Sequence, residues 1–259
     1  MSNTSYALPV LRGRGTSWNP PNRFEKLSLD REGWTDPDDP PPQTQLLNDT
    51  TRSILAYNDA PDVGFNVGIN PYRGCSHGCS YCYARPTHEY LGFSAGLDFE
   101  TKILVKRQAP ELLRKALSAK NWTPQVIGLS GNTDAYQPAE RRLRITRRCL
   151  EVLAEFRNPV GIITKSYLVS RDVDLLSDLA QHQAAAVALS ITTLDPHVQR
   201  VMEPRASSPA RRLGAIRVLA DAGIPVGVNV GPVIPGLTDH ELPAILEAVC
   251  LPGELSFEL

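Results

Sequence analysis

Short apolar runs alternate with amphipathic helical patterns along most of the chain, from Phe65 onward. Several of these runs are almost entirely apolar, which is typical of strands that are covered on both faces. The alternation of strand and helix at this spacing predicts parallel βαβ units, and therefore an α/β fold built on an open sheet or a barrel. The predicted strands are Phe65–Pro71, Thr101–Lys106, Val126–Ser130, Val160–Thr164, Ala186–Thr192 and Ile224–Val230.

The helices between these strands carry recognisable start and stop signals. Ser208 is a good N-cap residue and Pro209 suits a first helical turn, whereas Gly223 ends that helix before the next strand. Pro110 opens an earlier helix in the same way, and a further helix is predicted over Ala139–Phe156. Since parallel α/β folds place their functional groups at the carboxyl ends of the strands, the chemistry is expected there.

The first 62 residues do not follow this pattern. They contain eight of the 22 prolines and few regularly spaced apolar residues, which predicts an extended, partly disordered arm that packs on the main domain in places. Within it, Arg12 to Gly15 (RGRG) is a small basic segment whose composition is typical of a solvated tail. The predicted organisation is a Pro-rich arm, residues 1–62, followed by a core domain, residues 63–259.

Composition and charge narrow the functional class. The chain has 259 residues, of which 42% are apolar and 21% charged, with 27 basic and 28 acidic residues. These values exclude a collagen, a coiled coil and a wholly disordered chain, and they exclude binding of a polyelectrolyte through net charge alone. No run of 18 apolar residues occurs, and Met1 to Val10 lacks the basic start and apolar core of a signal peptide. We therefore expect a soluble, cytoplasmic protein with no membrane segment.

The most informative stretch is Gly74 to Tyr83 (GCSHGCSYCY), in which one short loop can place three thiolates around a compact metal centre. Its cysteines are Cys75, Cys79 and Cys82. Five cysteines in the whole chain are too few for a disulfide scaffold, and soft thiolates favour zinc, copper(I) or an iron–sulfur cluster. A structural zinc site needs a fourth ligand, for which His77 and His88 are candidates, whereas a cubane held by three cysteines leaves one iron open.

The cysteine motif resembles the signature of the radical SAM superfamily, C-x3-C-x2-C with an aromatic residue before the third cysteine, here Tyr81. Residues 79–84 (CSYCYA), 133–140 (TDAYQPAE) and 203–206 (EPRA) resemble the spore photoproduct lyase-like branch, which is often labelled DNA-repair-photolyase-like. The likeness covers about residues 65–249 and, more loosely, residues 19–24. It implies a partial (β/α)6 TIM-like barrel.

The resemblance implies two cofactors, a [4Fe–4S] cluster bound by the three cysteines and S-adenosylmethionine (SAM) bound to the open iron. In this superfamily an electron enters the sulfonium, the C5′–S bond breaks homolytically, and the 5′-deoxyadenosyl radical abstracts a hydrogen from the substrate. An electron donor such as flavodoxin or ferredoxin is also implied. Nucleic acid is the candidate substrate.

The resemblance indicates which residues would bind SAM, and each has a structural alternative. Asn132, Thr133 and Asp134 follow a strand at the place where the superfamily binds the SAM amino group, although turns use the same residue types. Lys165 comes directly after the strand Val160–Thr164, where it is either a partner of the SAM carboxylate or a lysine at the protein rim.

Three further candidates lie in the second half of the chain. Ser190 and Thr192 share one face of their strand, from which their hydroxyls would reach the ribose inside a barrel, and Thr192 is equally typical of ordinary strand composition. Arg205 is a candidate for binding a carboxylate or phosphate, or for capping nearby carbonyls. Residues 231–236 (GPVIPG) resemble the superfamily's adenine-contacting turn and also fit a simple Pro/Gly turn.

The helix Ala139–Phe156 carries the remaining candidates. Cys149 lies within its apolar stripe, which favours a core residue over a thiol hydrogen donor. Arg144, Arg147 and Arg148 on the opposite face form a basic patch that is typical of a solvated helix surface.

The recognisable pattern stops near Val249, and residues 250–259 (CLPGELSFEL) carry no motif, although Leu255–Leu259 would suit a short edge strand. We expect a C-terminally truncated barrel that lacks its last strand and is open at that edge. The leading hypothesis is a radical SAM enzyme of the photolyase-like branch. The alternatives are a zinc- or cluster-binding nucleic-acid module and an inactive fragment.

Overall fold

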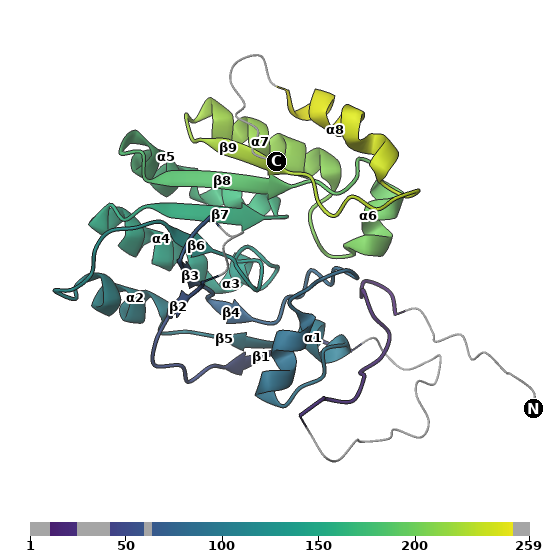
Figure 1. Ribbon diagram of the computed structural model, residues 1–259, viewed down its shortest axis with the longest axis horizontal. Helices are drawn as coiled ribbons and strands as arrows, with labels where there is room; N and C mark the ends of the chain where they lie inside the picture. The colour runs from purple at the N-terminus through teal and green to yellow at the C-terminus, as the bar shows by residue number, and fades with distance from the viewer. Residues whose placement is uncertain (1–10, 25–41, 60–63, 251–259) are drawn as a thin grey trace, which may run out of the picture.

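The structure is a computed structural model that describes residues 11–24, 42–59 and 64–250. Its main sheet has six strands in the order β2-β3-β6-β7-β8-β9 (Figure 1). All neighbours are parallel except β2 and β3, which pair antiparallel. The strands are β2 (Leu55–Tyr57), β3 (Val67–Ile69), β6 (Ile127–Leu129), β7 (Val160–Thr164), β8 (Ala185–Ser190) and β9 (Val226–Asn229). The α/β prediction is therefore confirmed, as a partial TIM-like barrel.

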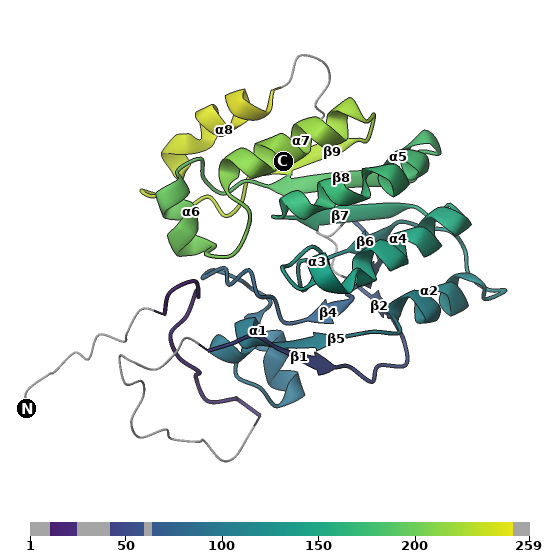
Figure 2. The ribbon, with the colours of Figure 1, turned by 180° about the vertical axis from the view of Figure 1, so that it is seen from behind.

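Four helices cover one face of this sheet, as the two opposite views show (Figures 1 and 2). They are α2 (Ala109–Leu117), α4 (Ile145–Phe156), α5 (Val173–Gln181) and α7 (Pro209–Asp221). Their apolar stripes pack on strand residues that are fully buried, such as Ile127, Ile162 and Leu189. The predicted signals hold, since Ser208 is the N-cap of α7 and Gly223, just after its end, has a positive φ of 73°.

Shorter elements connect these layers. They are α1 (Leu97–Thr101), α3 (Glu140–Leu143), α6 (Pro196–Met202) and α8 (Leu242–Val249), with the 3-10 turns η1 (Arg85–Leu91), η2 (Tyr167–Asp172) and η3 (Asp239–Glu241). In the part of the chain that the structure describes, no helix is long and apolar enough to cross a membrane.

One predicted strand belongs to a different sheet. The segment Thr101–Lys106 was expected among the parallel strands of the main sheet. Instead, β5 (Lys102–Val105) is the centre of a three-stranded sheet, parallel to β1 (Gln45–Asn48) and antiparallel to β4 (Tyr72–Arg73). The physical reason is visible in its burial pattern. Side chains along β5 alternate between buried and half-buried, so only one face is covered, whereas β6 is buried throughout.

The predicted helix Ala139–Phe156 is broken into α3 and α4. Arg144 adopts a left-handed conformation, with φ of 54°, and separates the two helices. The buried Glu140 carboxylate accepts hydrogen bonds from the backbone N–H groups of Thr146, at 3.0 Å, and Arg147, at 3.3 Å. A side chain of α3 therefore caps the start of α4, which makes the break favourable.

The outer edge of the main sheet is β9, whose side chains are half-buried or exposed. Between residues 64 and 250 the parallel series contains β3, β6, β7, β8 and β9, without a sixth parallel strand. Leu255–Leu259, which the sequence suggests as an edge strand, lies outside the described residues, as do residues 1–10, 25–41 and 60–63. Both β1 and β2 come from the first 62 residues, so part of the predicted arm contributes strands to the two sheets.

Candidate functional site

Residues 74–83, here called the cluster loop, follow β4 and carry the three spaced cysteines. Gly74 and Gly78 have positive φ values of 77° and 71°, which other residues rarely adopt, so the glycines allow the tight winding of the loop. Cys75 is buried, whereas Cys79 and Cys82 are partly exposed. The three cysteines thus differ in overall exposure, and Cys82 packs against the small buried cluster formed by Cys75, Ala84 and Phe99.

Several segments that are distant in the sequence hold the cluster loop in place. Its backbone is tied to the chain after β8 by two hydrogen bonds, from Ser80 N to the Met202 carbonyl (2.9 Å) and from Arg205 N to the His77 carbonyl (3.1 Å). A third bond joins Cys75 N to the carbonyl of Phe99, at 2.9 Å. Because these partners lie on rigid elements, the chain itself sets the loop's shape.

The segment of the arm that was expected to be a solvated tail packs on the cluster loop. Arg14 is half-buried and donates to the carbonyl oxygens of Pro42 (2.7 Å) and Glu100 (3.2 Å). The N–H of Gly15 donates to the buried Glu100 carboxylate at 3.1 Å, and a Cβ at Gly15 would lie 1.8 Å from the carbonyl oxygen of Gly78. Arg12 and Gly13 are exposed as predicted, but the solvated-tail prediction is wrong for Arg14 and Gly15, because both bond to Glu100, whose side chain is buried.

Residues 18–23 of the arm contact the neighbouring elements α1 and η1. Asn19 exchanges two hydrogen bonds with Asp98, at 2.8 and 2.9 Å, and the N–H of Leu97 donates to the Trp18 carbonyl at 3.1 Å. Further along, Arg23 is paired with the buried Glu89 at 2.6 Å. Residues 14–23 therefore form a strap along α1 and η1, beside the cluster loop (Figure 1).

Asp134 is one of the predicted SAM ligands, and its carboxylate is engaged within the protein. It accepts hydrogen bonds at 2.8 Å from the Thr164 hydroxyl, from Lys165 N and from Tyr136 N, and it lies 3.4 Å from His77 Nδ1. Burial alone would raise the pKa of Asp134, but the nearby His77 and these donors outweigh it and lower the pKa to about 2. Asp134 thus joins the cluster loop to the ends of β6 and β7.

Asn132 and Thr133, the two residues before Asp134, differ in burial. Thr133 is buried, and its hydroxyl donates to the Tyr72 carbonyl at 3.2 Å. Asn132 is exposed, with its backbone N–H bonded to Asn70 at 3.0 Å and its side-chain amide without a protein partner among the described residues. Of these three candidates, only Asn132 has a side chain free to bind a ligand.

A buried polar network links the cluster loop to the end of β8. The Tyr81 hydroxyl, on the loop, hydrogen-bonds Glu203 and lies 3.2 Å from the hydroxyl of Thr192, which donates to Glu203 at 2.8 Å. Arg212 of α7 forms an ion pair with Glu203, and both side chains are buried. Burial raises the pKa of Glu203, but Arg212, with Lys165 and Tyr81, outweighs it, so that the pKa is lowered overall.

Sequence reasoning missed Glu203 and Arg212. The stretch 203–206 (EPRA) drew attention to Arg205 instead. Arg205 is half-buried and donates to the hydroxyl of Thr44 at 3.2 Å, away from the Glu203 network. Glu203 directly follows α6 and Arg212 lies inside α7, so no local sequence pattern marks them as a pair, and their pairing depends on the tertiary fold.

The carboxyl ends of β7 and β8 carry two groups suited to a polar ligand. Ser190 is buried, and its hydroxyl has no hydrogen-bond partner. A buried hydroxyl without a hydrogen-bond partner lowers the stability of the folded protein, which points to a ligand or water at that position. Lys165 is half-buried, with its ammonium 5.8 Å from the centre of the Tyr81 ring, and it has no carboxylate partner within the described segments. An unpaired cation and an unsatisfied hydroxyl fit a ligand that carries a carboxylate and hydroxyls.

The surroundings of Cys75 and Cys79 raise the pKa of both thiols. Burial, followed by the nearby Asp134, raises the pKa of the Cys75 thiol. Burial, followed by Glu203, raises the pKa of Cys79 to about 12. Thiols in such surroundings stay protonated until a cation replaces the proton, and a metal–thiolate bond supplies that replacement.

Both histidines that the sequence offers as a fourth zinc ligand have other contacts in the structure. His77 faces Asp134, and His88 bonds the Lys102 carbonyl at 3.0 Å while its ring packs against Phe93 and Phe99. Among the residues that the structure describes, no three Cys, His, Asp or Glu side chains converge as one metal ion requires. The cysteines of a cubane each bind a different iron, so they need not converge on one point.

The helix α4 candidates lie away from this site. Cys149 is fully buried in the main core, which confirms the structural interpretation of this cysteine. Arg144 and Arg148 are exposed as predicted, but Arg147 is bound to Asp172 and Asp174 at 2.9 and 2.7 Å. The solvated-face prediction is therefore wrong for Arg147, because the end of η2 and the start of α5 each place a carboxylate beside it.

Comparison with known proteins supplies the family context. The model of the radical SAM superfamily matches residues 69–249. An uncharacterized protein of Mycobacterium tuberculosis is 40% identical over 187 residues, covering 71% of this chain and 55% of the relative, so the chain spans about half the length of that relative. A "Radical SAM Nalpha-GlyT isomerase" of Pseudomonas phage M6 is 28% identical over 173 residues, covering 66% of this chain and 34% of the relative.

Among solved structures, the fold resembles spore photoproduct lyase. The structure of that enzyme complexed with dinucleoside spore photoproduct matches with a TM-score of 0.57 and 20% sequence identity, over 78% of this chain and 58% of the lyase. At this level of identity the match concerns the fold. It agrees with the arrangement of parallel strands in the main sheet.

Proposed function

Because the chain belongs to the radical SAM superfamily, we propose that it is an enzyme that binds a [4Fe–4S] cluster through Cys75, Cys79 and Cys82 and cleaves SAM reductively. The single observation that carries this proposal is the cluster loop itself, whose three thiols stand at the carboxyl edge of the sheet. Its backbone is held by hydrogen bonds to α1 and to the segment after β8, and by the close approach of Gly15 in the arm. A cluster with bound SAM supplies one-electron cleavage of the sulfonium to a 5′-deoxyadenosyl radical.

The residues around the loop are suited to hold SAM. We assign the SAM carboxylate to Lys165, whose ammonium lacks a carboxylate partner in the described structure, and a ribose hydroxyl to Ser190, whose own hydroxyl is buried and unsatisfied. Asn132 offers a free amide for the amino group. Thr192 and Tyr81 act differently, because their hydroxyls are bound to Glu203 and fix the loop against β8.

We further infer a nucleic-acid-derived substrate. The fold match to a lyase complexed with a dinucleoside photoproduct supports this class. An electron donor such as flavodoxin or ferredoxin would supply the reducing electron.

The test is reductive cleavage of SAM by the anaerobically reconstituted protein. With dithionite as reductant, wild-type protein is expected to form 5′-deoxyadenosine, measured by liquid chromatography with mass spectrometry. Alanine variants at the three cysteine positions should lose this product. A Cys250→Ser variant is the matched control, since Cys250 is exposed and lies away from the loop. Absence of 5′-deoxyadenosine in wild-type protein that holds a full cluster would contradict the proposal.

A further inference from the structure

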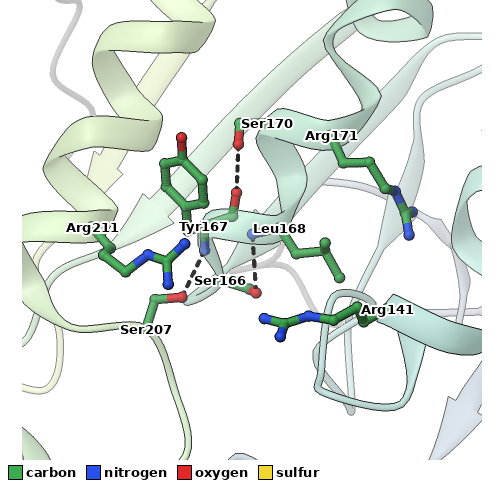
Figure 3. A pocket seen from close by; sticks show the side chains of 8 residues that line it. All are labelled: Arg141, Ser166, Tyr167, Leu168, Ser170, Arg171, Ser207 and Arg211. Carbon is green, nitrogen blue, oxygen red and sulfur yellow. Dashed lines mark hydrogen bonds between the residues drawn. The ribbon is translucent and has the colours of Figure 1, made fainter.

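A pocket lies between η2, α3 and the start of α7, apart from the cluster loop (Figure 3). Its volume is about 290 Å³, near the lower end of the roughly 300–1,000 Å³ that is typical of ligand pockets. Three arginines and three serines line it, without an acidic side chain: Arg141, Arg171, Arg211, Ser166, Ser170 and Ser207. The pocket is small, polar and positively charged.

Two of the three arginines are free to bind an anion. Arg171 is neutralised by Glu140 and Asp172, with hydrogen bonds of 2.8 and 2.7 Å. Arg211 contacts the Tyr167 ring, 4.7 Å from its centre, and neither Arg211 nor Arg141 has a carboxylate partner within the described ranges. Figure 3 shows these two guanidinium groups extending toward the serines from opposite sides, whereas Arg171 points away.

The serines add neutral donors between the two cations. Ser207 Oγ accepts a hydrogen bond from Tyr167 N at 2.8 Å, and Ser166 Oγ accepts one from Leu168 N at 3.3 Å. A hydroxyl that accepts from the backbone keeps its own proton to donate. The pocket therefore offers several donors and two positive charges to one ligand.

The start of α7 strengthens this preference for an anion. The helix has 13 residues, and its N-cap Ser208 makes no side-chain hydrogen bond to the first turn. Free N–H groups and the positive end of the helix dipole lie beside Ser207 and Arg211.

We propose that this pocket binds one phosphate-class oxyanion, held between Arg141 and Arg211 and hydrogen-bonded by Ser166 and Ser207. Tetrahedral oxyanions accept several hydrogen bonds from different directions, which matches donors that approach from opposite sides. The anion is either a free phosphate or phosphate monoester, or a phosphodiester of a nucleic-acid strand. Ser166 and Arg211 adjoin Lys165 and Arg212 in the sequence, and the backbone N–H of Ser207 donates to the Lys165 carbonyl at 3.2 Å, so the pocket shares backbone segments with the cluster-loop site.

The first experiment measures the binding of inorganic phosphate to the reconstituted full chain by isothermal titration calorimetry. Each charge-assisted hydrogen bond strengthens binding about tenfold or more. We therefore expect Arg141→Ala and Arg211→Ala each to weaken phosphate binding at least tenfold, and Arg211→Lys to retain part of it. Arg217→Ala is the matched control, because Arg217 is exposed on the same helix and does not line the pocket. Equal phosphate affinity in wild type and the Arg141→Ala/Arg211→Ala variant would overturn the proposal.

A second experiment identifies the source of the anion. Fluorescence anisotropy measures the binding of a labelled single-stranded oligonucleotide to the same proteins at several salt concentrations. If a phosphodiester is the ligand, the double variant binds more weakly with a smaller salt dependence, and inorganic phosphate competes in the wild type. If the ligand is a free phosphate or monoester, only phosphate binding falls. Neither binding measurement requires SAM cleavage. The anion-binding proposal can therefore be tested even if the protein does not cleave SAM.

Discussion

The ion pair between Arg212 and Glu203 makes a quantitative prediction about stability. Arg212 is 1% exposed and Glu203 is fully buried. Besides its ion pair, Arg212 donates to the carbonyl oxygens of Ser207 at 2.8 Å and Ser190 at 2.9 Å. An Arg212→Met substitution keeps the apolar stem but leaves the carboxylate without its ion-pair partner and two carbonyls without this donor.

The expected loss follows from those contacts. Removal of one partner of a buried ion pair typically costs about 3–5 kcal/mol. Since domains unfold with about 5–15 kcal/mol in total, this loss is a large fraction of the stability. The free energy of unfolding, measured by urea titration followed by circular dichroism, should therefore fall by about 3–5 kcal/mol in the Arg212→Met variant.

Two further variants separate this mechanism from a general packing effect. In Arg212→Met/Glu203→Gln the buried charge is gone, and the amide oxygen still accepts from Tyr81 and Thr192, so the double variant should be more stable than Arg212→Met alone. Arg217→Met, on the exposed face of α7, should stay within about 0.5 kcal/mol of wild type. The reasoning is refuted if Arg212→Met costs less than about 1 kcal/mol or if the double variant is the least stable protein.

Three other outcomes test separate parts of the structure. Gly15→Ala should lower the free energy of unfolding, measured in urea, by about 1–3 kcal/mol, because the added Cβ would lie 1.8 Å from a cluster-loop carbonyl oxygen. Gly64→Ala is the control and should leave the free energy of unfolding unchanged, because nothing lies within 4 Å of its added Cβ. Equal effects of the two substitutions would contradict the packing of the strap on the cluster loop. Burial lowers the pKa of His88 to about 4 in the folded protein, whereas an unfolded chain has a histidine pKa of about 6.5. As the pH drops from 6.5 to 4, protonation therefore favours the unfolded chain, and the free energy of unfolding should fall by roughly 3 kcal/mol. A His88→Gln variant should lose that part of the pH dependence, and an unchanged pH profile would count against it. Cys82→Ala should fail to assemble a cluster with four irons by iron and sulfide analysis, whereas Cys250→Ser should match wild type.

The place of the cluster loop in the fold can be predicted from the sequence because the relevant information is local. Ten residues contain the three cysteines, the glycines with positive φ and the aromatic Tyr81. The parallel strands are likewise indicated by short apolar runs. The burial of Cys149 can also be predicted from the sequence, because this residue lies in the apolar stripe of a helical pattern. These features depend on spacing along the chain alone.

The features that were missed depend on partners that are distant in the sequence. Arg14 looks solvated until the fold brings Glu100 next to it, 86 residues away. Glu203 becomes recognisable only when Arg212 and Tyr81 surround it. The strand β5 fits the parallel pattern in the sequence, but its half-covered face suits a second, smaller sheet.

The central claim is that the cluster loop holds a [4Fe–4S] cluster whose open iron binds SAM. The most direct test is low-temperature electron paramagnetic resonance of the anaerobically reconstituted, reduced protein, recorded with and without SAM. We predict a reduced-cluster signal whose shape changes when SAM is added. A cluster signal that is indifferent to SAM, or zinc as the bound metal with no iron signal, would contradict the claim.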